Sequence, residues 1–201
     1  MRIYRIDFDI ENFSQKDLLK YNEVLGRYFQ ANIDDFFRFS RLFYEPDKEM
    51  GWMFINTEMP PVMPSNLILG DSMELSNFYV HDVTDDLMRH VSGNTRILVY
   101  SPIIFPRSLG KVTLDNLGTA MQKLVNDVVE GVTIQLDESY IRRRPNRIFK
   151  KFELADKGWM SGAVVPFIAT GDIDQIKELI LRGIGELPEW GFGYIAAYEN
   201  Q

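Results

Sequence analysis

The sequence predicts an α+β protein built from two similar halves. Its 201 residues are 45% hydrophobic and 13% aromatic, which is enough apolar surface for the core of one large domain or two small ones. In each half, segments with apolar residues at every second position, typical of strands, alternate with segments whose apolar residues recur at helical spacing. No repeat in the sequence itself accompanies this rhythm.

The first half is predicted to begin with a strand, a helix and two more strands. Residues 2–10 alternate between apolar and charged side chains, which indicates a half-buried strand. Apolar residues recur at helical spacing between Leu18 and Asn32 and predict a helix there. Strand-like runs at Phe36–Tyr44 and Trp52–Asn56 predict a hairpin, and Phe78–Val83 is predicted to be a further strand.

The second half repeats this pattern. Apolar stripes predict helices at 117–128 and 172–181, and Gly183 stands where a helix C-cap is expected. Strands are predicted at Thr95–Ser101, Val132–Leu136, Ile148–Leu154, Met160–Ala169 and Phe192–Tyr198. Strands that alternate with amphipathic helices in two halves favour two tandem ferredoxin-like βαββαβ domains, at residues 1–92 and 93–201.

The residue content excludes several kinds of chemistry. Cysteine is absent, which excludes disulfides, thiolate metal sites and a cysteine nucleophile, and His81 and His90 are the only imidazole groups. We therefore expect no metal and no small-molecule cofactor. There is no apolar run of about eighteen residues, and Met1–Ile6 mixes charged with apolar side chains. The expectation is a soluble, cytoplasmic protein without a membrane segment.

The charge distribution is uneven. A formal net charge of −7 argues against a nucleic-acid partner, because phosphate binding depends on lysine and arginine. Residues 142–151, however, hold six basic and no acidic side chains, which leaves the other 191 residues with a net charge of −13. This pattern predicts one local positive face on an acidic protein.

The most specific motif is a glycine-rich loop at residues 183–193, between a helix and the last strand. Its glycines are Gly183, Gly185, Gly191 and Gly193. Glycine permits positive φ angles and lets backbone amides approach a ligand, so such a loop is suited to binding a sugar-phosphate chain. A dinucleotide fingerprint, in contrast, opens a helix after an early strand. The alternative is that the glycines only cap the helix and form a tight turn.

With Gly191-Phe192-Gly193 followed by Tyr194-Ile195, this loop resembles the C-terminal signature of the RAMP superfamily of CRISPR-associated proteins. Four shorter stretches resemble its branch of repeat-RNA-processing endoribonucleases, namely residues 39–45, 78–81, 100–103 and 145–147. The resemblance spans almost the whole chain. Only the glycine loop is a specific motif within it.

The resemblance implies a protein that binds CRISPR repeat RNA and cleaves precursor transcripts into guide RNAs without a metal. In this reaction the 2′-hydroxyl of the RNA attacks the adjacent phosphate and gives a 2′,3′-cyclic phosphate and a 5′-hydroxyl. The protein has to orient the strand, move protons and stabilise charge on the phosphate. Besides the RNA, other subunits of a CRISPR effector complex are implied as partners.

The catalytic candidates come from the same resemblance. Family members usually carry a histidine on or just after the first helix, and this chain has none between Ser14 and Tyr44. Tyr28 matches the family's helix tyrosine, and His81 is the imidazole candidate. The other candidates are cations of the region that faces the glycine loop in the family: Lys20, Arg27, Arg38 and Arg41. Alternatively, Tyr28 is a core aromatic and His81 an ordinary surface residue.

The candidate RNA contacts are the four loop glycines, two aromatic residues and the basic cluster. Trp190 and Phe192 are expected to stack on bases, unless Trp190 is buried against the second domain. The cations expected to contact phosphates are Arg142, Arg143, Arg144, Arg147, Lys150 and Lys151. Pro145 prevents a continuous helix through them, so we predict a hairpin. Glu186 and Glu189 in the loop would repel a phosphate.

Three functions remain open at this point. The first is a guide-RNA-processing endoribonuclease, and the second is a non-catalytic RNA-binding RAMP subunit of an effector complex. The third is a ferredoxin-like protein-interaction module, which the negative net charge and the acidic loop favour.

Overall fold

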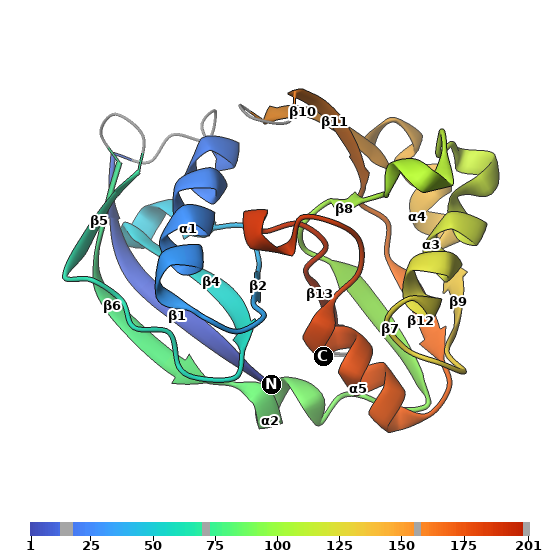
Figure 1. Cartoon of the computed structure of the whole chain (residues 1–201), viewed down its shortest axis with the longest axis horizontal. Helices are drawn as coiled ribbons and strands as arrows, with labels where there is room; N and C mark the ends of the chain where they lie inside the picture. Colours follow the sequence, from blue (N-terminus) through green and yellow to red (C-terminus); the bar gives the residue numbers. More distant parts are fainter. Residues whose placement is uncertain (13–17, 70–72, 155–157, 199–201) are drawn as a thin grey trace. The chain divides into compact units, whose positions relative to one another are not determined.

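The computed structural model describes residues 1–12, 18–69, 73–154 and 158–198, with the backbone alone at 18–20 and 46 (Figure 1). The chain divides into two compact units. The first holds Met1–Thr84 together with Pro188–Gly191, and the second holds Asp85–Leu187 together with Phe192–Gln201. Part of the glycine-rich loop therefore belongs to the first unit. The domain limits predicted from sequence, 1–92 and 93–201, instead place Pro188–Gly191 in the second domain.

The first unit contains one antiparallel sheet and the long helix α1. Its elements are β1 (Arg2–Glu11), α1 (Leu18–Asn32), β2 (Arg38–Phe39), β3 (Phe43–Glu45), the 3₁₀ turn η2 (Pro46–Lys48), β4 (Met50–Thr57), β5 (Asn66–Leu69) and β6 (Met73–Asp82). The strand order is β2-β4-β1-β6-β5, and β3 also pairs with β4. The segment predicted as one strand at Phe36–Tyr44 is two short strands, β2 and β3, which pair with different parts of β4.

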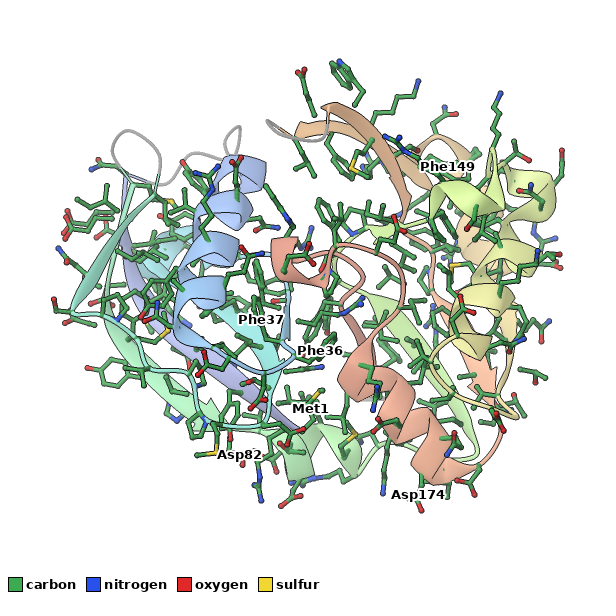
Figure 2. All side chains as sticks on the ribbon, in the orientation of Figure 1. Met1, Phe36, Phe37, Asp82, Phe149 and Asp174 are labelled. Carbon is green, nitrogen blue, oxygen red and sulfur yellow. The ribbon has the colours of Figure 1, made fainter. Side chains whose placement is uncertain are left out.

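The core of the first unit lies between α1 and the sheet, where side chains fill the space (Figure 2). The alternation in β1 turns Tyr4, Ile6, Phe8 and Ile10 into this core, as the period-two pattern predicts. Helix α1 buries its stripe against them, namely Tyr21, Leu25 and Phe29. The opposite face of the sheet carries the polar side chains of β1.

The second unit contains two sheets and four α-helices among its described residues. Its elements are α2 (Thr84–Met88, beginning in the first unit), β7 (Asn94–Val99), β8 (Ile103–Ile104), η3 (Arg107–Leu109), η4 (Leu114–Asn116), α3 (Leu117–Asn126), β9 (Thr133–Leu136), α4 (Glu138–Arg143), η5 (Pro145–Arg147), β10 (Phe149–Leu154), β11 (Gly158–Ala163), β12 (Phe167–Thr170), α5 (Ile173–Arg182) and β13 (Ile195–Ala197). The turn η6 (Pro188–Trp190) belongs to the first unit. The strand orders are β13-β7-β12-β9 and β10-β11-β8.

Helix α5 follows its sequence signals closely. Asp172 caps its first turn by accepting hydrogen bonds from the amides of Asp174 (2.9 Å) and Gln175 (3.2 Å). The helix ends at Gly183, whose φ of 64° lies in the left-handed region. Its buried face consists of Ile176, Leu179 and Ile180.

Two predictions from the sequence are wrong in this unit. Residues 160–169 are not one strand but two, because β11 and β12 belong to different sheets. The basic cluster does not form a hairpin at its start, because Arg142 and Arg143 form the last turn of α4. Asp137 caps this helix and Pro145 ends it, so it is too short to show an apolar period. None of the described helices is long and apolar enough to span a membrane.

Candidate nucleic-acid interface

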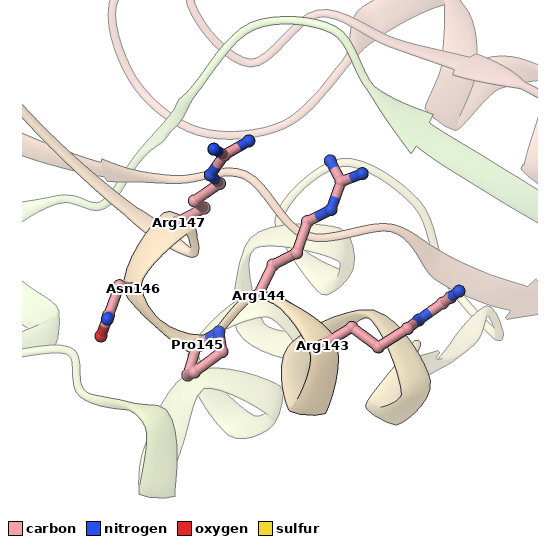
Figure 3. Close-up of a pocket in the computed structure, with 5 residues that line it drawn as sticks. All are labelled: Arg143, Arg144, Pro145, Asn146 and Arg147. Atoms are coloured by element: carbon pink, nitrogen blue, oxygen red, sulfur yellow. The ribbon is translucent and has the colours of Figure 1, made fainter.

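The six cations of residues 142–151 form a surface that we call the basic cluster. All six side chains are exposed, and none of them forms an ion pair with a carboxylate of the described residues. Arg143, Arg144 and Arg147, with Pro145 and Asn146, line a cavity of about 400 Å³ (Figure 3). Figure 3 shows Arg144 and Arg147 extending to the same side of the segment. Phosphate groups are therefore the chemistry that this surface suits best.

Asp137 anchors the helix that carries this cluster. Its carboxylate accepts hydrogen bonds from the Ser139 hydroxyl (2.6 Å), the amide of Tyr140 (2.9 Å) and the guanidinium of Arg96 (2.7 Å). The hydrogen bond from Ser139 and then that from Tyr140 lower the pKa of Asp137 to about 2. Arg143 in turn donates to the carbonyl of Ser139 at 3.1 Å. These hydrogen bonds stabilise the first turn of α4, the helix whose last turn carries Arg142 and Arg143.

The hairpin β10–β11 continues the basic cluster and adds an aromatic residue that the sequence analysis missed. Phe152 is buried and stacks on Phe192, with ring centroids 4.9 Å apart and planes 13° from parallel. Trp159 lies opposite Glu153, which follows Phe152 in β10 and therefore points to the other face of the hairpin. The Trp159 ring projects from that face and is 74% exposed. Lys151 lies on the same face, two residues along β10. The hairpin therefore offers a cation and an open ring together.

The glycine-rich loop is packed more tightly than the sequence analysis expected. Its amides already donate within the protein, from Gly183 to Leu179 (2.8 Å), Gly191 to Pro188 (3.0 Å) and Gly193 to Pro102 (2.9 Å). These three amides are therefore not presented to a phosphate in this structure. Gly185 has a φ of 86°, and a Cβ there would stand 2.6 Å from the carbonyl oxygen of Ile104.

The two aromatic residues of the loop differ in exposure. Phe192 is 1% exposed because its ring is covered by the stack with Phe152. A base cannot reach that ring in this structure. Trp190 is half-buried in η6, which packs on α1 and β2 within the first unit.

Glu189 has a partner inside the first unit. Arg38 on β2 is 4% exposed, and this burial lowers the pKa of its guanidinium to about 10, while the carboxylate of Glu189 opposes the shift. One of the two acidic residues in the loop therefore compensates a buried cation.

Tyr28 on α1 is tied to its surroundings. Its hydroxyl donates to the carbonyl of Val62 at 2.7 Å, and its ring meets Phe29 edge-on at 5.7 Å. Burial raises the pKa of Tyr28, so the hydroxyl stays protonated at neutral pH. Arg27 beside it is exposed and pairs with Glu23 at 2.6 Å. Lys20 lies on the same helix, and its side chain lies outside the described residues.

His81 and Arg41 lie away from this helix face. Phe78 and Val80 of β6 pack on the core that α1 covers, so His81 projects to the opposite face of the sheet, where its Nε2 lies 3.6 Å from the carboxylate of Asp7. Trp52 is paired with Asp7 across the strands, so it shares that face. Phe43 stacks on Trp52 at 5.5 Å, and Arg41 covers the ring of Phe43 at 5.1 Å. The structure thus does not bring His81 and Arg41 together with Tyr28.

Comparison with known proteins places the fold in a class. No family model and no curated protein matches the sequence. Solved structures do match, and they define an α+β fold of the RAMP type, as found in Cas6 and in the CRISPR endoribonuclease Cse3. The resemblance predicted from the sequence is confirmed by this similarity over nearly the whole chain.

Three matching structures show how far the structural similarity extends. A CRISPR-associated protein Cas6 superposes with a TM-score of 0.62 at 13% identity, covering 98% of this chain and 100% of the other. The product of a Cas6-related gene from Pyrococcus furiosus gives 0.58 at 15% identity, covering 99% and 100%. Cse3 from Thermus thermophilus, bound to an RNA that represents a pre-cleavage complex, gives 0.54 at 12% identity, covering 99% and 100%. At these identities the similarity shows a shared fold.

Proposed function

We propose that this protein binds CRISPR repeat RNA through the exposed face of its second unit. The observation that carries the proposal is the basic cluster, whose six cations have no carboxylate partner among the described residues. Trp159 adds an open ring on the face of the hairpin that also carries Lys151. Cations that follow a phosphate chain and rings that stack on bases are the two common elements of single-strand binding. The fold, shared with an RNA-bound Cse3, supports the same function.

The proposal includes a ferredoxin-like topology for each unit. Numbered along a βαββαβ pattern, the strands β13-β7-β12-β9 run in the order 4-1-3-2. In the first unit β6-β1-β4-β2 follow the same order when β3 and β5 are set aside. The place of its second helix is taken by residues 58–65 and β5.

Salt dependence tests the binding proposal. Each phosphate contact releases counterions, so the logarithm of the RNA affinity falls linearly with that of the salt concentration. Replacing Arg142, Arg143 and Arg144 by alanine should flatten this slope by up to about three units. A matched triple variant of exposed cations elsewhere in the unit should leave the slope unchanged: Arg89→Ala, Lys123→Ala and Arg182→Ala. Failure of the unmodified protein to bind repeat RNA at low salt would instead favour a protein-interaction module.

A second candidate function is metal-independent cleavage of the bound RNA, which the likeness to a pre-cleavage complex favours. In this reaction the 2′-hydroxyl loses its proton to water and its oxygen forms a bond to the adjacent phosphorus. The bond to the 5′-oxygen breaks, that oxygen takes up a proton from the donor, and the donor regains a proton from water. Tyr28 is the proposed proton donor, and Arg27 and Lys20 are the proposed charges that stabilise the phosphate. Arg38 is left out, because its side chain is buried. His81 and Arg41 are left out, because they project from the other face of the sheet.

Incubation with repeat RNA in the presence of EDTA separates the two candidates. A discrete cut with a cyclic-phosphate end, abolished by a 2′-deoxy substitution at the cut, supports cleavage. RNA that stays intact but is retarded on a native gel supports a non-catalytic RNA-binding subunit.

A further inference from the structure

A second cavity lies beside the glycine-rich loop, wholly within the second unit. It has a volume of about 420 Å³, within the range of ~300–1,000 Å³ typical of sites for small molecules. Its lining residues are Pro106, Arg107, Ser108, Met160, Glu186 and Leu187. The cavity at the basic cluster is lined by other residues, so the two cavities are separate sites.

The backbone fixes two walls of this cavity. The amide of Glu186 donates to the carbonyl of Ile104 at 3.0 Å, which ties the loop to β8. Leu187 follows with a φ of 61°, an uncommon conformation for a residue other than glycine. On the other side, Arg107 and Ser108 belong to the one-turn helix η3, which closes with a hydrogen bond from Gly110 to Arg107.

The side chains combine apolar walls with two charges. Pro106, Met160 and Leu187 are half-buried and offer apolar surface. Arg107 and Glu186 are exposed, and neither forms an ion pair with a described residue. The ligand that suits this cavity therefore has an apolar body, an anionic group and hydrogen-bond donors that face a carboxylate.

A nucleotide meets these requirements, and the carboxylate selects among the bases. Unpaired bases in RNA are commonly recognised by hydrogen bonds to their Watson–Crick edges. The guanine edge presents two adjacent donors, N1–H and the N2 amino group, which match the two oxygens of a carboxylate. Adenine and cytosine present one amino donor beside an acceptor nitrogen. Uracil places two carbonyl oxygens beside its single N–H, and these repel a carboxylate.

We propose that this cavity binds an unpaired guanine nucleotide of the RNA, with Glu186 on the Watson–Crick edge of the base and Arg107 on the phosphate. The inference rests on the proposed RNA-binding function and gives it base specificity. It also accounts for an acidic side chain in a loop of an RNA-binding protein. Glu189 interacts with the buried cation Arg38. Glu186, in this proposal, accepts hydrogen bonds from the guanine base.

Binding of short oligomers to the full chain tests the proposal. The probes are a fluorescent octamer of uridines with one central guanosine and three analogues that carry inosine, adenosine or uridine at that position. Inosine lacks only the N2 amino group. The unmodified protein should bind the guanosine oligomer about fivefold or more tightly than the inosine oligomer, because a bidentate contact gives discrimination of that order. Glu186→Gln should reduce this ratio to about one.

Glu130→Gln is the matched control, because Glu130 is an exposed carboxylate of the same unit that does not line the cavity. It should keep the guanosine preference. Equal affinity of the unmodified protein for all four oligomers would overturn the cavity proposal while leaving RNA binding intact. An unchanged preference in Glu186→Gln would overturn it as well. No binding of any oligomer at low salt would overturn both proposals.

Discussion

Gly26 in α1 and Glu189 in η6 lie so close that no side chain fits between them. A Cβ atom on Gly26 would stand less than 3.0 Å from the carbonyl oxygen of Glu189. Glycine inside a helix costs about 1 kcal/mol relative to alanine, so this position is unfavourable for α1 alone. The contact explains its presence, because it lets the segment Pro188–Gly191 pack on the helix within the first unit.

Replacing Gly26 by alanine should therefore destabilise the protein despite the higher helix propensity of alanine. We expect the free energy of unfolding to fall by about 1–3 kcal/mol, the usual effect of overpacking, as measured by urea denaturation. Gly118→Ala in α3 is the control, because the nearest atom to its added Cβ is a Leu136 methyl at 3.8 Å. The control should be neutral or slightly stabilising. A Gly26→Ala protein as stable as the unmodified chain would contradict the packing described here.

The two faces of the hairpin β10–β11 should respond differently to substitution. Phe192→Ala removes a ring buried against Phe152 and should cost about 3–5 kcal/mol of stability. Trp159→Ala removes a ring that is 74% exposed, so the unfolding transition should not move. Its RNA affinity, measured by fluorescence anisotropy, should fall by about 1–3 kcal/mol if a base stacks there. An unchanged affinity would remove Trp159 from the interface.

Asp137 should make stability depend on acid pH. Its folded-state pKa of about 2 lies below its unfolded value near ~3.9, so its contribution is present at neutral pH and is lost as the pH falls through that interval. Asp137→Asn should therefore be less stable than the unmodified protein at pH 7, and the difference should shrink towards pH 2.5 in urea titrations. Asp127→Asn, at an exposed carboxylate, should show no such convergence. A constant difference for Asp137→Asn would refute the assignment.

Much of the fold could be predicted because the determining patterns are local. The alternation in β1 and the caps of α5 each reside within about a dozen residues of sequence, and both predict the observed element. Helix α4 escaped prediction because it is too short to show a period. Its one local signal is Asp137, a residue type favoured at helix N-caps, which accepts a hydrogen bond from the amide of Tyr140.

The candidate sites could be predicted only in part, because they depend on contacts between distant segments. The basic cluster is a run in the sequence and was found there. The open face of Trp159 follows from the stack of Phe152 on Phe192, which no local pattern reveals. The same holds for the burial of Arg38 near Glu189 and for the face of the sheet that carries His81.

The packing of Pro188–Gly191 within the first unit has a consequence for synthesis on the ribosome. Because translation proceeds from the N-terminus, residues 1–84 emerge long before the four residues that complete their packing. Until then Gly26 and Phe39 lack their contacts with this segment. The first unit should therefore reach its final stability late in translation, and a fragment that ends at residue 92 should remain less stable than the same residues in the whole chain.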